Sequence, residues 1–489
     1  MTNLSGANLN NGAAVGPQGE GRESPSRFPK YPAYKDSGVD WLGEVPLGWR
    51  VGNLKHALVE LVSGGTPESN NSAYWSDGDG IPWVAISDMT RGSIVDSTAK
   101  SLTEAGLKSK GLRVIPAGGL LYSIYASIGK VAVLGLNAAT NQAILGLMLD
   151  SQVAEQSFIK WWLVSLEGWV KTMASSNTQD NLNAEKVRNL PLVFPSLLEQ
   201  AQVTRFLDHE TARIDALIEE QQRLIELLKE KRQAVISHAV TKGLDPTVPM
   251  KDSGVEWLGE VPAHWDVCSV RRVISAIEQG WSPECEANPT DEDAWGVLKA
   301  GCVNRGVFDP SENKTLPAWL EPVAEYEVRA GDILMSRASG SPELVGSTAL
   351  LGEVRGKLML SDKIFRIHLE AKISSSFFVW VMNAQFMRAQ IEQALSGGNG
   401  LANNLPQSSL LAFWLAVPPS HEQVAIAEYI NKLAGEIDAL ISEGGSAVEL
   451  LQERRAALIS AAVTGKIDVR GWQPTASIQA PEPAVAEAN

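Results

Sequence analysis

The sequence has few cysteines, no long apolar run and no excess of positive charge, and each shortage excludes a class of protein. Its three cysteines, Cys268, Cys285 and Cys302, form no Cys-x-x-Cys pair, so neither a disulfide framework nor a zinc site is indicated. We expect them to be buried or half-buried hydrophobic residues of a protein in the reducing cytoplasm. No apolar run approaches the roughly 18 residues of a membrane-spanning helix, so no membrane association is expected.

The formal net charge of −15 opposes non-specific attraction to nucleic acid, but a DNA site needs only a local basic face. Residues 1–33 lack the apolar core of a signal peptide and are rich in Gly, Asn, Ser and Pro. We therefore expect a disordered leader there, and a disordered acidic tail over residues 471–489.

The motifs of three enzyme classes are also missing. A nucleotide-driven motor needs a Gly-rich loop ending in Gly-Lys-Ser/Thr, and Gly129-Lys130 lacks the hydroxyl residue. Val417–Ser420 does not match the Pro-Pro-aromatic motif of DNA adenine methyltransferases. Asp362 with Glu370 and Lys372 loosely resembles a metal-dependent nuclease site and stays open as one alternative. We expect the chain to carry no catalytic centre and no cofactor of its own.

What the sequence does contain is a tandem duplication. The segment Glu199–Asp245 is repeated without a gap as Glu422–Asp468. A second segment, Lys35–Trp49, which we call the entry phrase, is repeated as Lys251–Trp265. The chain is therefore a phrase, a globular region and a long helix, followed by the same three parts again. The glycines and tryptophans of the phrase predict a structured turn that docks an aromatic ring at the entrance of each globular region.

The repeated 199–245 and 422–468 segments predict long helices. Charged residues alternate with apolar ones at 3.5- to 3.6-residue spacing, and about forty residues would make a rod roughly 60 Å long. A rod cannot bury a single apolar seam alone, so we expect the two helices to pack on each other as a coiled coil. The predicted seam of the first copy comprises Ile214, Leu217, Ile218, Leu224, Ile225, Leu228, Val235 and Ala239.

The globular regions alternate short β-type runs with Gly, Pro, Asn and Ser turns, and each adds a helix, near residues 158–173 and 377–393. The predicted fold class is α+β, with two globular α/β domains alternating with two long helices. The predicted boundaries are 34–195 and 246–418 for the domains, and 196–245 and 419–470 for the helices. The globular regions have diverged while phrases and helices have not, which favours two binding modules for different targets on a shared frame.

Polar loops at matching places in both globular regions are candidates for binding. Asn and Gln can pair with adenine and Arg and Lys with guanine, while Ser and Thr hold phosphates. The alternative for any one of these residues is an ordinary turn. The candidate DNA-binding residues are Ser63, Gly64, Thr66, Ser123, Tyr125, Ser127, Lys130, Asn141, Gln142, Asn177, Gln179, Lys299, Arg305, Ser336, Arg337, Ser339, Lys363 and Asn399.

This order of parts resembles the specificity subunit of type I restriction–modification enzymes, called HsdS. The resemblance rests on the two phrases, on Gly118–Ser123 and Gly331–Ser336, and on the Pro-x-x-x-Glu-Gln sequences that begin at Pro195 and Pro418. It implies that each globular domain is a target-recognition domain for one half of a bipartite DNA site. It also implies an antiparallel coiled coil that spaces these domains and docks partner subunits.

The partners implied by the resemblance are double-stranded DNA, two methyltransferase subunits and restriction/translocase subunits. S-adenosylmethionine, Mg²⁺ and ATP would be used by those partner subunits. The candidate docking residues on the helices are Ile214, Leu217, Leu228, Val235, Ile437, Leu440, Leu451 and Leu458. An alternative from another class is a coiled-coil scaffold whose globular domains bind protein partners.

Overall fold

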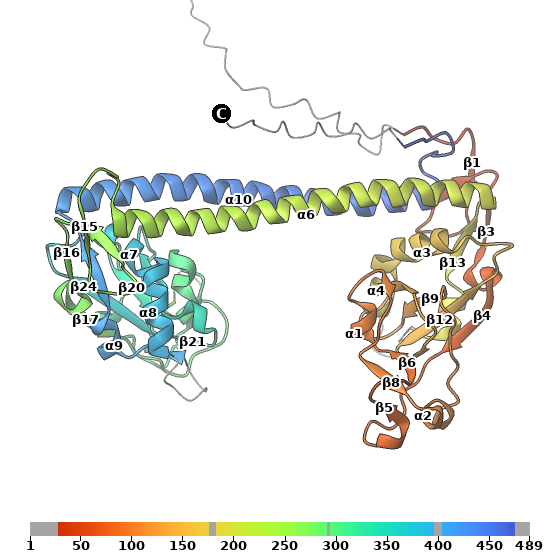
Figure 1. Ribbon diagram of the computed structural model, residues 1–489, viewed down its shortest axis with the longest axis horizontal. Coiled ribbons are helices and arrows are strands. Elements are labelled where there is room, and N and C mark those ends of the chain that lie inside the picture. The colour runs from red at the N-terminus through yellow and green to blue at the C-terminus, as the bar shows by residue number, and fades with distance from the viewer. Residues whose placement is uncertain (1–27, 176–181, 291–293, 396–402, 475–489) are drawn as a thin grey trace, which may run out of the picture. The chain divides into compact units, whose positions relative to one another are not determined.

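The computed structural model describes residues 28–175, 182–290, 294–395 and 403–474. The chain forms two compact units, unit 1 from Met1–Glu219 with Val448–Asn489 and unit 2 from Glu220–Ala447. The predicted boundaries separate the long helices from the globular domains. The compact units instead each contain part of both long helices, α6 (Leu197–Lys242) and α10 (Ser420–Val463) (Figure 1). We call residues 50–194 of unit 1 head 1, and residues 266–417 of unit 2 head 2.

Each entry phrase forms a short antiparallel hairpin. Strand β1 (Tyr34–Asp36) pairs with β2 (Glu44–Pro46), and β14 (Met250–Asp252) pairs with β15 (Glu260–Pro262). Gly38 and Gly43 turn the first hairpin with φ of +70° and +66°, a conformation that side chains resist. Trp49 and Trp265 end the phrases and are buried in the cores of their units, which confirms the predicted docking of an aromatic ring.

Head 1 is built on two sheets. The first has the strand order β4 (Leu58–Ser63), β12 (Ile144–Leu149), β9 (Leu120–Ser123), β10 (Val131–Leu134) and β7 (Ile94–Val95). The second has the order β11 (Ala139–Thr140), β6 (Ile81–Val84), β8 (Lys100–Leu102) and β5 (Trp75–Ser76). Helix α3 (Gln156–Ser165) lies between the first sheet and the long helices of unit 1, so its apolar face closes the core (Figure 1).

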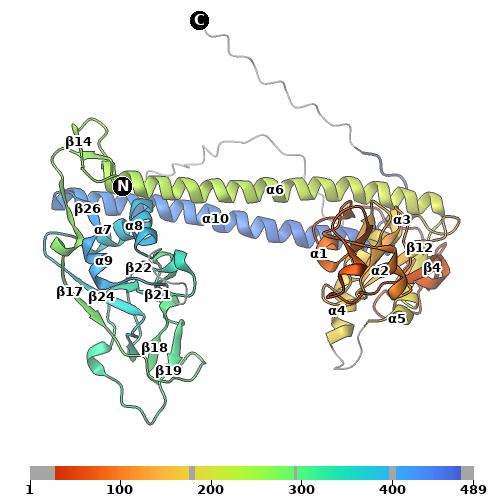
Figure 2. The same ribbon diagram turned by 60° about the horizontal axis from the view of Figure 1, so that its bottom comes forward.

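Head 2 repeats this plan, with four strands in one sheet and three in the other (Figure 2). One sheet has the order β17 (Ile274–Gln279), β24 (Ile364–Leu369), β20 (Ile333–Ser336) and β22 (Thr348–Leu350). The other has the order β19 (Asn313–Thr315), β18 (Gly296–Leu298) and β23 (Leu358–Met359). Helix α7 (Ser375–Met382) takes the place of α3 and buries Phe377 and Phe378. The predicted α+β class is thus confirmed in both units.

The single helix expected in each head is interrupted. Helix α4 (Glu167–Ser175) follows α3 after Leu166, and α8 (Gln385–Leu395) follows α7 after two residues. At both breaks a polar side chain hydrogen-bonds an earlier helix carbonyl, Ser165 to that of Trp162 at 2.6 Å and Asn383 to that of Val379 at 2.9 Å. Such side chains compete with the helix ladder, which explains why apolar periodicity alone missed the breaks.

Helices α6 and α10 run antiparallel within each unit. In unit 1 the Arg455 guanidinium lies 2.7 Å from the Asp215 carboxylate, and Ile214 shares a core with Leu458. In unit 2 Arg232 lies 2.9 Å from Asp438. Since Asp215 and Asp438 are equivalent in the two copies, as are Arg232 and Arg455, the same ion pair forms twice with the helices exchanged. The predicted antiparallel pairing is confirmed.

The buried seam of the pair is narrower than predicted. Ile214, Ile437 and Leu458 are buried, whereas Leu217, Leu224 and Leu440 are 41%, 47% and 51% exposed. Leu228, Val235 and Leu451 are half-buried. The prediction of a seam position is therefore wrong for Leu217 and Leu224, because a two-helix contact covers one stripe and leaves flanking apolar residues in solvent.

The glutamine of each Pro-x-x-x-Glu-Gln sequence ties a long helix to its head. Gln200 is buried and its amide nitrogen donates to the carbonyl of Pro195 at 3.0 Å, while its oxygen accepts the N–H of Glu155 at 2.8 Å. Gln423 repeats this, with Pro418 at 2.9 Å and the N–H of Ser374 at 2.7 Å. Because a buried amide needs all these partners, the motif fixes where each helix leaves its head.

Cysteine burial agrees with the expectation from sequence. Cys268 and Cys302 are buried and Cys285 is half-buried, all as thiols. Burial, with the nearby charges of Asp309 and Glu312, raises the pKa of the Cys302 thiol to about 12. None of the helices in the described part of the chain combines the length and the apolar composition that crossing a bilayer requires.

Candidate nucleic-acid interface

Five of the predicted residues of head 1 meet at the end of β4. Ser63 and Gln142 are exposed, and the side chains of Thr66 and Gln142 are hydrogen-bonded to each other. A Cβ on Gly64 would lie 2.0 Å from the carbonyl oxygen of Asn141, so only glycine allows these two loops to approach. The loops 63–66 and 141–142 therefore form one polar surface, as their composition suggested.

The end of β9 and the loop that leads to β10 contain four more candidates. Ser123 is fully buried, where its hydroxyl bonds the carbonyl of Ser127 and accepts the N–H of Lys130 at 3.0 Å. A DNA contact by the Ser123 side chain was therefore a wrong prediction, because its hydroxyl is used inside the loop. Tyr125 is 37% exposed, Ser127 is half-buried and Lys130 is exposed, so these three remain candidates.

Lys130 has a carboxylate partner. Its ammonium lies 3.2 Å from Glu167, which also contacts Lys171 at 2.6 Å. Burial alone would raise the pKa of Glu167, but the hydrogen bonds and charges of Lys171 and Lys130 outweigh it and hold this pKa below its ordinary value of 4.5. Lys130 is thus held by a charged partner that a phosphate would have to replace.

In head 2 the predicted residues of the β20 edge divide in the same way. Ser336 aligns with Ser123 and is also fully buried, so its predicted DNA contact is wrong because of burial alone: unlike Ser123, its hydroxyl has no hydrogen-bond partner among the described residues. Arg337 is half-buried, lies 5.6 Å from the ring centroid of Phe365 and donates to the carbonyl of Asp362 at 3.3 Å. Lys363 is exposed and pairs with Asp362 at 3.4 Å, and Ser339 is half-buried.

Lys299 and Arg305 lie on or beside the short 3-10 helix η5 (Ala300–Gly306). Lys299 lies 3.7 Å from Glu312. Arg305 is exposed, has a φ of +58° and lines a groove of about 1140 Å³ between head 2 and the long helices of unit 2. A positive φ is uncommon for arginine, so this backbone is held by its surroundings. Asn177, Gln179 and Asn399 lie outside the described residues.

The nuclease alternative is wrong. Asp362 precedes β24 and Glu370 follows it, so an extended strand of roughly 25 Å separates the two carboxylates. Carboxylates that share a catalytic metal ion lie within a few ångströms of one another. Within the described residues, no group of three or more His, Cys, Asp or Glu side chains is arranged to hold a metal ion.

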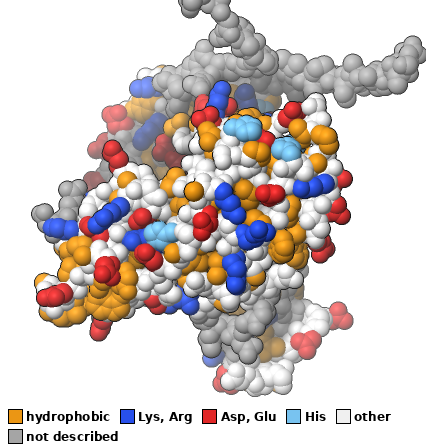
Figure 3. Space-filling view, turned by 90° about the vertical axis from the view of Figure 1, so that its left-hand side faces the viewer, with side chains coloured by type: hydrophobic (Ala, Val, Ile, Leu, Met, Phe, Trp, Pro, Cys, Tyr) orange, Lys and Arg blue, Asp and Glu red, His pale blue; other side chains and the backbone are white. Residues whose placement is uncertain are grey.

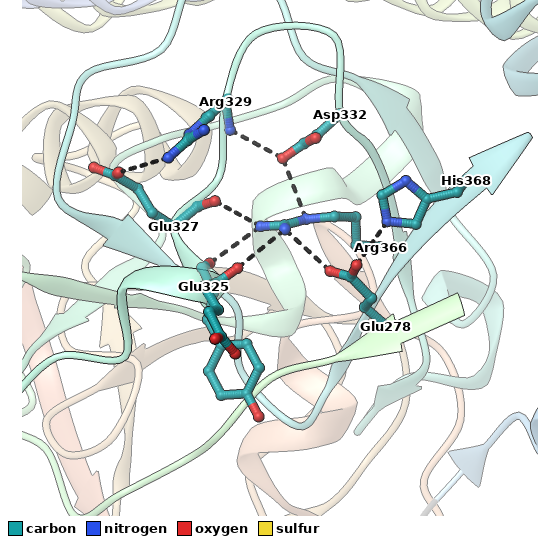
Figure 4. A network of polar contacts seen from close by, with 8 residues as sticks. Glu278, Glu325, Glu327, Arg329, Asp332, Arg366 and His368 are labelled. Carbon is teal, nitrogen blue, oxygen red and sulfur yellow. Dashed lines mark hydrogen bonds and ion pairs between the residues drawn. The ribbon is translucent and has the colours of Figure 1, made fainter. Parts of the chain in front are cut away.

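Arg366 was not singled out by any sequence motif, yet it organises the polar core of head 2 (Figure 4). Its buried guanidinium donates to Glu278 at 3.1 Å and to the carbonyl of Glu327 at 2.6 Å, and lies 3.3 Å from Asp332. These contacts join β17 and β24 to the loop before β20. The alternating pattern of β24 gave no signal for it, because a polar residue in a strand normally faces solvent.

The charges of unit 2 are mixed on the face that Figure 3 shows. Lys and Arg side chains alternate there with Asp and Glu, and hydrophobic side chains lie between them. A surface that follows a phosphate backbone requires a continuous basic stripe. This face of unit 2 therefore lacks the electrostatic pattern of a DNA interface.

Comparisons with known proteins agree on one family. A family model for the type I restriction modification DNA specificity domain matches residues 46–228. The chain is 30% identical to the specificity subunit of the type I restriction enzyme EcoEI of Escherichia coli over 325 residues, 66% of this chain and 51% of that subunit. The chain thus spans about half the length of this relative.

Other relatives align over more of their length. The specificity subunit of the type I restriction enzyme EcoKI of Escherichia coli K12 is 20% identical over 447 residues, 88% of this chain and 91% of that subunit. A solved structure described as "Structural basis underlying complex assembly and conformational transition of the type I R-M system" matches with a TM-score of 0.64 at 15% identity. It covers 86% of this chain and 98% of that chain. At this identity the likeness concerns the fold.

Proposed function

Because this chain belongs to the family of type I restriction–modification DNA specificity subunits, we propose that it recognises a bipartite DNA site. Head 1 would recognise one half-site and head 2 the other, with the paired helices setting the unread spacer. The observation that carries this proposal is the tandem duplication, in which diverged heads are attached by equivalent contacts to helices that have stayed alike. Two different modules on a repeated frame suit a DNA site with two different halves.

Each head offers its own candidate contacts. In head 1 they are the polar surface around Gln142 and the loop that presents Tyr125 and Lys130. In head 2 they are Arg337 and Lys363 at the β20 edge, together with Arg305. Amide and guanidinium groups can bond base edges, whereas lysine favours phosphates, so both kinds of contact are available in each half.

Exposed leucines on the long helices support docking of two copies of one partner. Unit 1 exposes Leu217 and Leu450, and unit 2 exposes their equivalents Leu440 and Leu227. In the register set by the Asp215–Arg455 pair, Leu217 and Leu450 lie within about one helical turn along the pair. Repeat-equivalent apolar patches fit two identical methyltransferase subunits, which would supply S-adenosylmethionine-dependent methylation.

The restriction subunits would join the same assembly and use ATP and Mg²⁺. We propose that this chain contributes recognition and no catalytic group. Purified alone it should neither methylate nor cut DNA, whereas with a cognate methyltransferase subunit it should direct methylation to one split motif. Methylation by the isolated chain, after removal of contaminating partners, would contradict the proposal.

The decisive experiment is methylome sequencing with and without this gene, in cells that express the partner subunits. Exchanging residues 49–195 for the matching region of a related subunit should change one half-site and leave the other unchanged. If both half-sites change together, the two heads are not independent recognition modules. If no DNA modification depends on the gene, the protein-binding scaffold becomes the better reading.

A further inference from the structure

One tryptophan of head 1 contacts both long helices. The indole N–H of Trp161, on α3, donates to the carboxylate of Asp208 on α6 at 2.8 Å. The guanidinium of Arg455, on α10, lies 5.8 Å from the centroid of the same ring. Trp161 is buried, so these contacts are made at the boundary between α3 and the helix pair (Figure 1).

Unit 2 repeats this arrangement with the two helices exchanged. The indole N–H of Trp380, on α7, donates to Asn431 on α10 at 2.9 Å. The guanidinium of Arg232, on α6, lies 5.8 Å from the Trp380 ring. Asn431 stands at the repeat position of Asp208, and Arg232 at that of Arg455.

Each arginine is itself held in place. Arg455 forms a two-pronged ion pair with Asp215, with Nε to Oδ1 at 2.7 Å and Nη2 to Oδ2 at 3.1 Å. Arg232 does the same with Asp438, at 2.9 and 3.1 Å. A planar guanidinium held by two bonds can present its face to an aromatic ring at little further entropic cost.

Retention of this tryptophan contrasts with the divergence around it. Trp162, beside Trp161, corresponds to Val381 beside Trp380, and Lys160 corresponds to Val379. Both Trp162 and Val381 are buried and fill core volume without touching both helices through polar groups. Core filling therefore tolerates change at the neighbouring position, and the retained tryptophan points to a requirement other than volume.

We propose that Trp161 with Arg455, and Trp380 with Arg232, are positioning residues that fix each head against the helix pair. A head joined to both helices cannot turn about either one, so its recognition surface keeps one direction relative to the pair. This inference rests on the proposed function, since a fixed direction matters for recognising two half-sites at one spacing. The role is distinct from that of residues that contact the bases.

The first test measures the attachment itself, without DNA. Hydrogen exchange of the full chain is compared for the wild type, Arg455→Ala and Arg232→Ala. Arg455→Ala should speed exchange of the α3 amides about three- to thirtyfold and leave α7 unchanged, and Arg232→Ala should do the reverse. Arg213→Ala, which removes an exposed arginine from α6, should change neither helix. Unchanged exchange at α3 and α7 in the first two variants would overturn the proposal.

The second test measures the length of the spacer between the two half-sites. It uses methylome sequencing of cells that co-express each variant with the partner subunits. Loosening one head should keep the letters of both half-sites, lower methylation at the native spacer and add sites whose spacer differs by one base pair. A native spacer distribution in Arg455→Ala and Arg232→Ala, or altered half-site letters, would contradict the positioning role. Absence of methylation by the wild type would instead refute the proposed function, and the exchange measurements would still decide the attachment.

Discussion

Arg337 has two competing uses for its guanidinium. In the structure it lies over Phe365 and donates to the carbonyl of Asp362, contacts that hold the loop after β20. A base edge or a phosphate could still take its remaining N–H groups, because Arg has five donors and these contacts use few of them. The side chain is half-buried, so its partners limit the directions in which it can act.

Arg337→Ala should weaken specific DNA binding by about 1–3 kcal/mol and relax specificity at one position if the guanidinium holds a base. If it holds a phosphate, affinity should fall by the same factor for every DNA sequence. The slope of log affinity against log salt concentration should then become shallower by about one unit. Competition binding with the assembled enzyme at several salt concentrations separates these results. Lys363→Ala, an exposed neighbour, serves as the phosphate-type control, and unchanged binding would leave Arg337 with its structural role alone.

Glu167 couples stability to pH through its two lysines. Its pKa in the folded protein lies below the ordinary value of 4.5, although burial opposes the shift, because Lys171 and Lys130 stabilise the carboxylate. A lowered folded pKa contributes stability that is fully present above the unfolded pKa and is lost as the pH falls through the folded one. The relevant window therefore lies below about pH 4.5.

Glu167→Gln should lower the free energy of unfolding by a constant amount above that window and by progressively less as the pH falls within it. Urea unfolding at pH 7 and at several acidic pH values measures the difference. The matched control is Glu104→Gln, which removes an i,i+4 carboxylate–lysine pair whose side chains are 83% and 78% exposed. A difference between wild type and Glu167→Gln that does not shrink on acidification would contradict this account.

At the scale of secondary-structure elements, the sequence predicted the features that follow from its internal repeat and from the spacing of its apolar residues. Two copies of one helix can be recognised without any structure, and alternating strands such as Ile364–Leu369 follow from residue type. What it missed depends on tertiary partners. Leu217 and Leu224 share the period of buried apolar residues, yet a pair of helices covers too narrow a stripe to bury them. Ser123 and Ser336 looked like loop residues for a ligand, but the fold buries both side chains.

The polar contacts that attach each head to the long helices could be found from the sequence by comparing its two halves. Trp161 and Trp380 occupy one repeat position, as do Gln200 and Gln423, so aligning the two halves reveals residues that divergence has spared. Their partners could not be predicted, because helix periodicity does not tell which face meets which head. Arg366 had no equivalent signal, since its role depends on three consecutive carbonyls, those of residues 325–327, that only the fold brings to its guanidinium.

The adjacent glycines of α10 test whether this helix is continuous. Gly444 and Gly445 lie in its interior, where glycine costs about 1 kcal/mol relative to alanine. A Cβ on Gly445 would have no heavy atom within 4 Å beyond its own helix and chain neighbours, whereas one on Gly444 would lie 3.1 Å from the Ile225 side chain. The two positions therefore differ in steric room and share backbone geometry.

Gly445→Ala should raise the free energy of unfolding by about 0.5–1 kcal/mol, and Gly444→Ala should gain less because Ile225 must move. Urea midpoints of the two single variants make the comparison directly. Destabilisation by Gly445→Ala would show that the backbone at this position is not helical in solution. Equal gains at both positions would show that Ile225 does not pack against Gly444.

At the scale of the whole molecule, the paired helices are proposed to act as a ruler between the half-sites. Inserting four residues after Leu228 and four after Leu451, which are repeat-equivalent positions, would lengthen the helix pair by about 6 Å. Four residues exceed one helical turn only slightly, so the apolar stripe is roughly preserved, although the register between the insertion points moves by about one turn. The ion pairs Asp215–Arg455 and Asp438–Arg232 lie outside those points and keep their partners.

Since bases stack about 3.4 Å apart, the spacer between half-sites should grow by one or two base pairs while both half-sites keep their letters. A longer spacer also rotates one half-site about the DNA axis, so some loss of affinity is expected. Methylome sequencing of the double-insertion variant provides the measurement, with a single insertion after Leu228 as the control that shifts one helix without lengthening both. An active variant that still methylates the original spacing would show that the distance between half-sites is set elsewhere in the assembly.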